Sequence, residues 1–121
     1  MARVLIIEDN PVNMRLAAFL LQNAGHKVLQ GVDAEIGMQC ALKQLPDLIL
    51  MDMQLPGIDG LTATRQLKAD TATANIKIVA LTAFAMTGDE ERFRAAGCDA
   101  YLAKPIRYQE FLSLVTSILK P

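Results

Sequence analysis

Short apolar runs alternate with longer amphipathic stretches along the chain, and this alternation predicts its secondary structure. The apolar runs are four to six residues long, which is typical of strands buried in a sheet, and turn-forming residues separate them from the amphipathic stretches. They predict five strands, at Arg3–Ile7, Lys27–Gln30, Asp47–Met51, Ile76–Leu81 and Ala100–Ala103.

The amphipathic stretches between these runs predict five helices. Asn10 and Pro11 are typical of a helix N-terminus, because an Asn side chain caps the first turn and Pro needs no hydrogen bond there. Asp33 is a second expected cap, and Thr87 with Glu90 has the spacing of a capping box. The predicted helices run from Pro11 to about Asn23, from Asp33 to about Gln44, from about Leu61 to Ala69, from Thr87 to Gly97 and from Tyr108 to Leu119.

Strands that alternate with helices indicate a parallel α/β sheet. Right-handed crossovers between parallel strands then place helices on both faces of that sheet. The chain has 121 residues, of which 52% are hydrophobic and 21% charged, so it can bury a core of its own. Because no repeat or linker interrupts the pattern, we predict one domain over residues 1–121.

Composition excludes several classes of function. Twelve Lys and Arg against 13 Asp and Glu give a net charge of -1, and the basic residues do not cluster, so no direct nucleic-acid partner is expected. The apolar run Leu16–Leu21 is too short to span a membrane and no signal peptide opens the chain, which favours a cytoplasmic protein without membrane insertion. Cys40 and Cys98 are expected to be reduced, partly buried thiols, and His26 to be a surface residue without a chemical role.

Four of the predicted strands end on residues that bind metal ions or phosphate. These residues are Glu8 and Asp9 after the first strand, Asp52 after the third, Thr82 after the fourth and Lys104 after the fifth. In an open parallel sheet the carboxyl ends of the strands meet at one edge, where ligands bind. Carboxylates repel one another unless a cation lies between them, and Mg²⁺ prefers oxygen ligands. The pattern therefore predicts a site for Mg²⁺ and a phosphoryl group.

Asp52 is the most informative of these residues, because it lies between the apolar Met51 and Met53 and a carboxylate in a core needs a partner. We expect Asp9 and Asp52 to bind Mg²⁺ directly and Glu8 to bind it through water. The main-chain carbonyl of Gln54 would complete the ligands from the protein. Without Asp52, the acidic pair after the first strand would be interpreted as solvated surface acids.

The order of these residues, with Thr82-Ala83 after the fourth strand and Lys104-Pro105 after the fifth, resembles the receiver domain of bacterial two-component response regulators over the whole chain. The resemblance implies a flavodoxin-like, doubly wound sheet with the strand order 2-1-3-4-5, the order of the chemotaxis regulator. It also implies that Asp52 accepts a phosphoryl group from a phosphohistidine. The donor would be a sensor histidine kinase or a histidine phosphotransfer protein.

The same resemblance implies a switch that responds to phosphorylation. Lys104, the Thr82 hydroxyl and the Ala83 backbone amide would bind the phosphoryl oxygens, and the Lys104–Pro105 bond would be cis. Thr82 would move toward the phosphate while Tyr101 turns inward. The fourth helix, fifth strand and fifth helix would then contact a downstream protein, with the chain a monomer or a weak dimer. Such a chain is a signalling module that catalyses only its own phosphorylation and dephosphorylation.

Two kinds of receiver remain open. The stretch from Thr82 to Cys98 most resembles single-domain receivers of the DivK type, which govern cell division and polar differentiation. The opening Glu8-Asp9-Asn10 with Asn13 is equally typical of receivers attached to hybrid histidine kinases. Because Pro121 directly follows the last predicted helix, a complete chain would signal through protein contacts.

The phosphoryl group is expected to be moderately long-lived. Gln54 and Phe84 stand two residues after Asp52 and Thr82, positions that flank the path of the hydrolytic water in receivers. The bulk of both side chains implies slow access for that water.

Two alternatives from other classes fit the residues less well. An aspartyl phosphatase that uses Mg²⁺, of the haloacid dehalogenase type, needs a second Asp two residues after the nucleophile, where this chain has Gln54. A flavodoxin would bind flavin at the same edge of the sheet, but the acidic pair Glu8-Asp9 does not suit a phosphate cradle.

Overall fold

The computed structural model describes residues 2–83 and 89–120, and within them the predicted sheet is confirmed. Five parallel strands form one sheet in the order β2-β1-β3-β4-β5. The predicted cap Thr87 and the side chain of Phe84 lie outside the described residues. The strands are β1 (Arg3–Ile7), β2 (Lys27–Gly31), β3 (Leu48–Asp52), β4 (Lys77–Thr82) and β5 (Ala100–Ala103).

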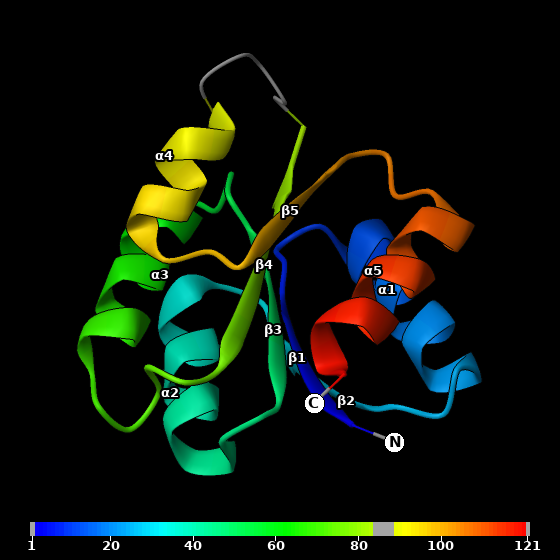
Figure 1. Cartoon of the computed structure of the whole chain (residues 1–121), viewed down its shortest axis with the longest axis horizontal. Helices are drawn as coiled ribbons and strands as arrows, with labels where there is room; N and C mark the ends of the chain where they lie inside the picture. Colours follow the sequence, from blue (N-terminus) through cyan, green and yellow to red (C-terminus); the bar gives the residue numbers. More distant parts are fainter. Residues whose placement is uncertain (1, 84–88, 121) are drawn as a thin grey trace.

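Helices cover both faces of the sheet, so the molecule has three layers (Figure 1). One face carries α1 (Pro11–Asn23) and α5 (Tyr108–Leu119), and the other carries α2 (Ala34–Gln44), α3 (Gly60–Ala69) and α4 (Asp89–Ala96). Successive side chains of a strand point to opposite faces, so each strand contributes to two separate cores. All five residues of the central strand β3 are buried, as its apolar sequence predicted.

The predicted caps fix the start of the first two helices. Asn10 Oδ1 accepts hydrogen bonds from the backbone N–H groups of Val12 and Asn13, at 2.9 and 3.1 Å. Asp33 Oδ1 accepts one from the backbone N–H of Ile36 at 2.8 Å. Because α1 begins directly after Asn10, the acidic pair at the end of β1 is held in a short loop between a strand and a capped helix.

Strands β3 and β4 end one residue later than the sequence predicted. Asp52 pairs with Leu81 in the parallel ladder, and the backbone N–H of Met53 donates to the Leu81 carbonyl at 2.9 Å. Thr82 pairs in turn with Ala103 on β5. The two chemically important side chains therefore belong to the sheet itself and have its rigidity, instead of lying in the loops beyond it.

Two predictions about single residues need correction or refinement. His26 is half-buried instead of lying on the surface, and its Nδ1 accepts a hydrogen bond from the backbone N–H of Ala2 at 3.2 Å. Burial lowers the pKa of His26. Cys98 is buried and Cys40 half-buried, and both are free thiols.

Within residues 2–83 and 89–120, no helix combines the length and the apolarity that crossing a bilayer requires.

Helix α3 begins in contact with the backbone of the strand that carries Asp52. Gly60 is buried, and a Cβ at this position would collide with the carbonyl oxygen of Asp52 and lie 2.9 Å from Met53 Cα. The Thr64 hydroxyl, one helical turn later, donates to the Gly60 carbonyl at 2.8 Å. Only glycine therefore allows α3 to approach the end of β3 this closely.

Replacing Gly60 by Ala should lower the free energy of unfolding by about 1–3 kcal/mol, because the added methyl group overpacks the contact with β3. Urea unfolding of both proteins measures the difference. Gln66→Ala, on the exposed side of the same helix, is the control and should change stability by less than about 0.5 kcal/mol. Equal stability of Gly60→Ala and the wild type would contradict the close approach.

Candidate functional site

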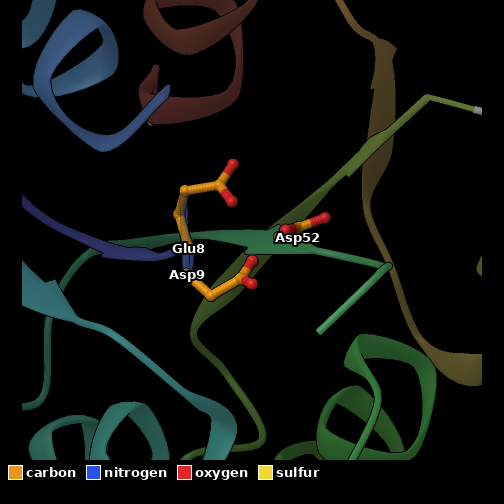
Figure 2. Close-up of side chains that lie close together, drawn as sticks. All are labelled: Glu8, Asp9 and Asp52. Carbon is orange, nitrogen blue, oxygen red and sulfur yellow. The ribbon is translucent and has the colours of Figure 1, made fainter. Parts of the chain in front are cut away.

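Three carboxylates gather where β1 and β3 end (Figure 2). Glu8 and Asp9 directly follow β1, Asp52 is the last residue of β3, and one carboxylate oxygen of each lies within 4.8 Å of the others. Glu8 and Asp52 are each only 2% exposed, whereas Asp9 is exposed. The structure therefore brings the three predicted acids together at one edge of the sheet.

Lys104 reaches from the end of β5 to the two buried acids. Its Nζ lies 2.9 Å from Glu8 Oε1 and 3.1 Å from Asp52 Oδ1. Its own side chain is 15% exposed. The sequence led us to place Lys104 against an incoming phosphoryl group. In this structure its ammonium group lies between two of the predicted metal ligands and offsets their charge.

Backbone groups hold the acids in place. The N–H of Gln54 donates to Asp52 Oδ1 at 2.9 Å, and the N–H of Asn10 donates to Glu8 Oε2 at 3.2 Å. The N–H of Lys104 donates to the Thr82 carbonyl at 2.7 Å, and the peptide bond that follows, Lys104–Pro105, is cis. Both buried carboxylates are thus oriented by main chain, before any ligand binds.

The donor set fits a magnesium ion. Glu8 Oε1 is buried and accepts no hydrogen bond within the described part of the chain, although it is ion-paired with Lys104. A buried oxygen in this condition can still serve a cation or a water bound to one. Carboxylate oxygens without His or Cys ligands suit Mg²⁺ better than Zn²⁺. Glu8, Asp9 and Asp52 together therefore meet the requirements of a magnesium site.

Burial and pairing move the pKa values of the two buried acids in opposite directions. Desolvation, together with the neighbouring Asp52, raises the pKa of Glu8 above its ordinary value. Desolvation also acts on Asp52, but hydrogen bonds from Glu8 and the Gln54 amide and the charge of Lys104 outweigh it and lower the pKa of Asp52. The pKa of Lys104 is raised, since its pairs with both acids outweigh its own desolvation. These directions favour the ionised form of Asp52, which is the form that a nucleophile needs.

The Gln54 side chain connects the two groups that were expected to bind phosphoryl oxygens. Its Nε2 donates to Thr82 Oγ1 at 3.0 Å, and its Oε1 accepts from the Ala83 backbone N–H at 3.1 Å. Thr82 is fully buried and Gln54 is exposed. Sequence reasoning considered only the carbonyl and the bulk of Gln54. No sequence signal marks this contact, because a polar residue after a strand is typical of any loop.

Tyr101 connects β5 to helix α4. It is half-buried, and its ring centroid lies 6.2 Å from that of Phe93 on α4, with the ring planes tilted by 56°. It pairs across the β4–β5 ladder with Ala80, which lies two residues before Thr82 on β4. The residue proposed as a switch is therefore paired with the strand that ends at Thr82 and in ring contact with α4.

Comparison with known proteins gives a consistent result. Residues 4–116 match the response regulator receiver domain family. The chain is 43% identical over 116 residues to the polar-differentiation response regulator DivK of Brucella anthropi, covering 96% of this chain and 94% of that protein. No comparison supports the phosphatase alternative.

Solved structures agree with this assignment. The receiver domain of a Pseudomonas aeruginosa sensor histidine kinase, crystallised with a magnesium ion coordinated in its active-site cleft, is 36% identical with a TM-score of 0.90, covering 98% of this chain and 97% of that one. The chemotaxis protein CheY4 of Vibrio cholerae shares the fold at 24% identity and a TM-score of 0.93, covering 98% and 99% of the two chains. The chain belongs to the response regulator receiver domain family.

Proposed function

We propose that this chain is the phosphoacceptor of a two-component phosphorelay, with residues 1–121 acting as one receiver domain and Asp52 as the residue that is phosphorylated. The observation that carries the proposal is the buried Asp52 carboxylate, which lies 3.1 Å from Lys104 Nζ and within 4.8 Å of carboxylate oxygens of Glu8 and Asp9. A nucleophile, a cation and a metal-binding cluster in one place are the components of phosphoryl transfer to a carboxylate.

The reaction is a transfer of a phosphoryl group from a phosphohistidine of the donor protein. A carboxylate oxygen of Asp52 attacks the phosphorus, a P–O bond forms, and the P–N bond breaks with its electron pair going to the imidazole. Lys104 keeps its positive charge beside Asp52 and offsets negative charge on the transferring oxygens. Glu8, Asp9, Asp52 and the Gln54 carbonyl would hold Mg²⁺ at this site, and the ion would supply further charge neutralisation. Aspartyl phosphates hydrolyse, which limits the duration of the signal.

The signal leaves the site through Thr82 and Tyr101. Thr82 and the Ala83 amide bind oxygens of the new phosphoryl group, and Tyr101 turns inward beneath α4. Its present contact with Phe93 on α4 supports this route, because a change at Tyr101 must repack that helix. The face formed by α4, β5 and α5 then contacts the downstream protein. The described part of α4 is rich in charge, with ion pairs Asp89–Arg92 and Glu90–Arg94, which favours a polar partner surface.

The proposed biological role is that of a single-domain regulator of cell division or polar differentiation. The similarity to DivK, which extends over 94% of that protein, supports this role. The chain acts on no substrate other than itself, and it works in the cytoplasm, where histidine kinases obtain ATP. The 36% identity to a receiver of a sensor histidine kinase supports a second candidate, a receiver within a hybrid kinase. The reading frame beyond residue 121 distinguishes the two.

Acetyl phosphate with Mg²⁺ should label the protein with one hydroxylamine-labile phosphate, and Asp52→Asn should abolish the labelling, because the amide is not a nucleophile. Intact-protein mass spectrometry measures the added phosphate. Asp33→Asn is the matched control, since Asn also caps a helix well, and it should be labelled fully. Labelling that survives Asp52→Asn, or that needs no divalent cation, would refute the assignment of the nucleophile and the metal.

Removal of metal should make stability depend on pH through Glu8. Its folded pKa is raised, so its contribution is complete below the ordinary Glu pKa and is lost as the pH rises through the folded value. The contribution of Asp52, whose pKa is lowered, is complete above its ordinary value and stays constant in that window. Thermal unfolding in EDTA should therefore show wild-type stability falling with pH, whereas Glu8→Gln should remove this loss.

Mg²⁺ at 100 times its dissociation constant should stabilise the wild type by about 2.7 kcal/mol. Glu35→Gln, an exposed acid on α2, is the control and should behave as the wild type with and without metal. If Glu8→Gln and the wild type lost stability equally as the pH rises, Glu8 would not be the acid whose raised pKa causes the loss.

Thr82→Ala should accept the phosphoryl group but transmit it poorly. Beryllofluoride with Mg²⁺, which imitates a phosphoryl group on Asp52, should shift the amide resonances of Tyr101 and α4 much less in this variant than in the wild type. Thr73→Ala is the matched control, because Thr73 is also fully buried but donates its hydroxyl hydrogen bond to the Leu67 carbonyl. Equal shifts in Thr82→Ala and the wild type would show that Thr82 does not couple the site to the surface.

A further inference from the structure

The Gln54 side chain makes hydrogen bonds to the two groups that bind phosphoryl oxygens in the proposed function. Its carboxamide lies between Thr82 Oγ1 and the Ala83 backbone N–H, at 3.0 and 3.1 Å. The two partners are consecutive residues at the end of β4, and Asp52 lies on the neighbouring strand, paired with Leu81. A phosphoryl oxygen that bonds to the Ala83 N–H would displace Oε1 of Gln54, and because one planar carboxamide makes both contacts, Nε2 would leave Thr82 with it.

The chemistry of the partners fixes which way the carboxamide faces. The Ala83 N–H can only donate, so it must meet Oε1, and Nε2 then donates to the Thr82 hydroxyl. Thr82 Oγ1 is therefore an acceptor toward Gln54. A phosphoryl oxygen without a proton can only accept a hydrogen bond. The same hydroxyl must therefore donate to it. Because a hydroxyl can accept one hydrogen bond while it donates another, the direct competition with Gln54 is for the single proton of the Ala83 N–H.

Gln54 can release these contacts without moving its backbone. Its own N–H is bonded to Asp52 Oδ1 at 2.9 Å, which anchors the main chain, whereas its side chain is exposed. A cavity of about 130 Å³ adjoins the side chain and offers room for another rotamer. Polar side chains in the wall of that cavity can receive the displaced carboxamide: Asp59, Asp89 and Arg92.

We propose that Gln54 is a latch that holds Thr82 and Ala83 in the unphosphorylated arrangement and competes with the phosphoryl group for them. The inference rests on the proposed function, and it makes Gln54 a positioning residue for that reaction. The latch separates two parts of one residue. The backbone of Gln54 stays with Asp52 and the metal site, while its side chain reports whether the phosphoryl group is present.

The latch has a measurable cost for the active state. Breaking two hydrogen bonds of ordinary net strength weakens binding of a phosphoryl mimic by about tenfold. Gln54→Ala and Gln54→Met remove both hydrogen bonds, and Met keeps the length of the side chain. Both variants should therefore bind beryllofluoride in the presence of Mg²⁺ about tenfold more tightly than the wild type. Because beryllofluoride is not hydrolysed, this equilibrium measurement is independent of any effect of Gln54 on the hydrolytic water.

The experiment is a beryllofluoride titration of the wild type, Gln54→Ala, Gln54→Met and the control Gln66→Ala, followed by amide resonances. Gln66→Ala removes an exposed Gln of helix α3 and should bind as the wild type does. Without beryllofluoride, the resonance of the Ala83 amide should already be shifted from its wild-type position in both Gln54 variants. In a Thr82→Ala background, Gln54→Ala should tighten binding by clearly less than tenfold, since one of its two contacts is already lost.

Three results would overturn the latch. The first is wild-type or weaker beryllofluoride binding by folded Gln54→Ala and Gln54→Met. The second is an Ala83 amide that is unchanged in both variants, and the third is the same gain in affinity with and without Thr82. Failure of the proposed function gives a different pattern, in which the folded wild type binds no beryllofluoride although the Ala83 amide still responds to Gln54→Ala.

Discussion

The ammonium group of Lys104 between Glu8 and Asp52 is the interaction on which the site depends. Two carboxylates that are each 2% exposed could not both be close together and ionised without a cation, since desolvation and mutual repulsion would protonate them. Lys104 Nζ lies within 3.1 Å of both and favours the ionised form of Asp52, whereas burial and the neighbouring Asp52 still raise the pKa of Glu8. The protein thus maintains an ionised carboxylate in a buried position, as the proposed phosphoacceptor role of Asp52 requires.

This interaction is available only because of the topology of the sheet. The order β2-β1-β3-β4-β5 places β1 beside β3 and β4 beside β5, so that the parallel strands deliver the acids, Thr82 and Lys104 to one edge. The sheet is packed between two apolar cores, and Gly60 allows α3 to pack against the end of β3. The geometry of the site is therefore set by the burial and the pairing of the strands that lead into it.

Most of the fold and the membership of the site could be predicted from sequence, because both follow from patterns that repeat along the chain. Buried strands are apolar, caps such as Asn10 are local, and parallel strands bring their carboxyl ends together. The contacts that were missed depend on distances across the fold. Nothing near Lys104 in sequence indicates that its Nζ lies between Glu8 and Asp52, and nothing near Gln54 indicates that its carboxamide reaches β4. Strands β3 and β4 end one residue later than predicted, at Asp52 and Thr82, because ladder pairing decides where a strand ends and depends on contacts across the fold.

The division of the interior into two cores gives the domain an inherent asymmetry. Tyr101 packs into the core beneath α2, α3 and α4, whereas the next residue, Leu102, is buried in the core beneath α1 and α5. The sheet separates these cores, so a rearrangement of Tyr101 is felt first by the layer that includes α4. The layer of α1 and α5 lies on the other side of the sheet from Tyr101 and packs into the other core. A change at Tyr101 can therefore reach α5 through β5 itself, whereas it reaches α4 by direct packing.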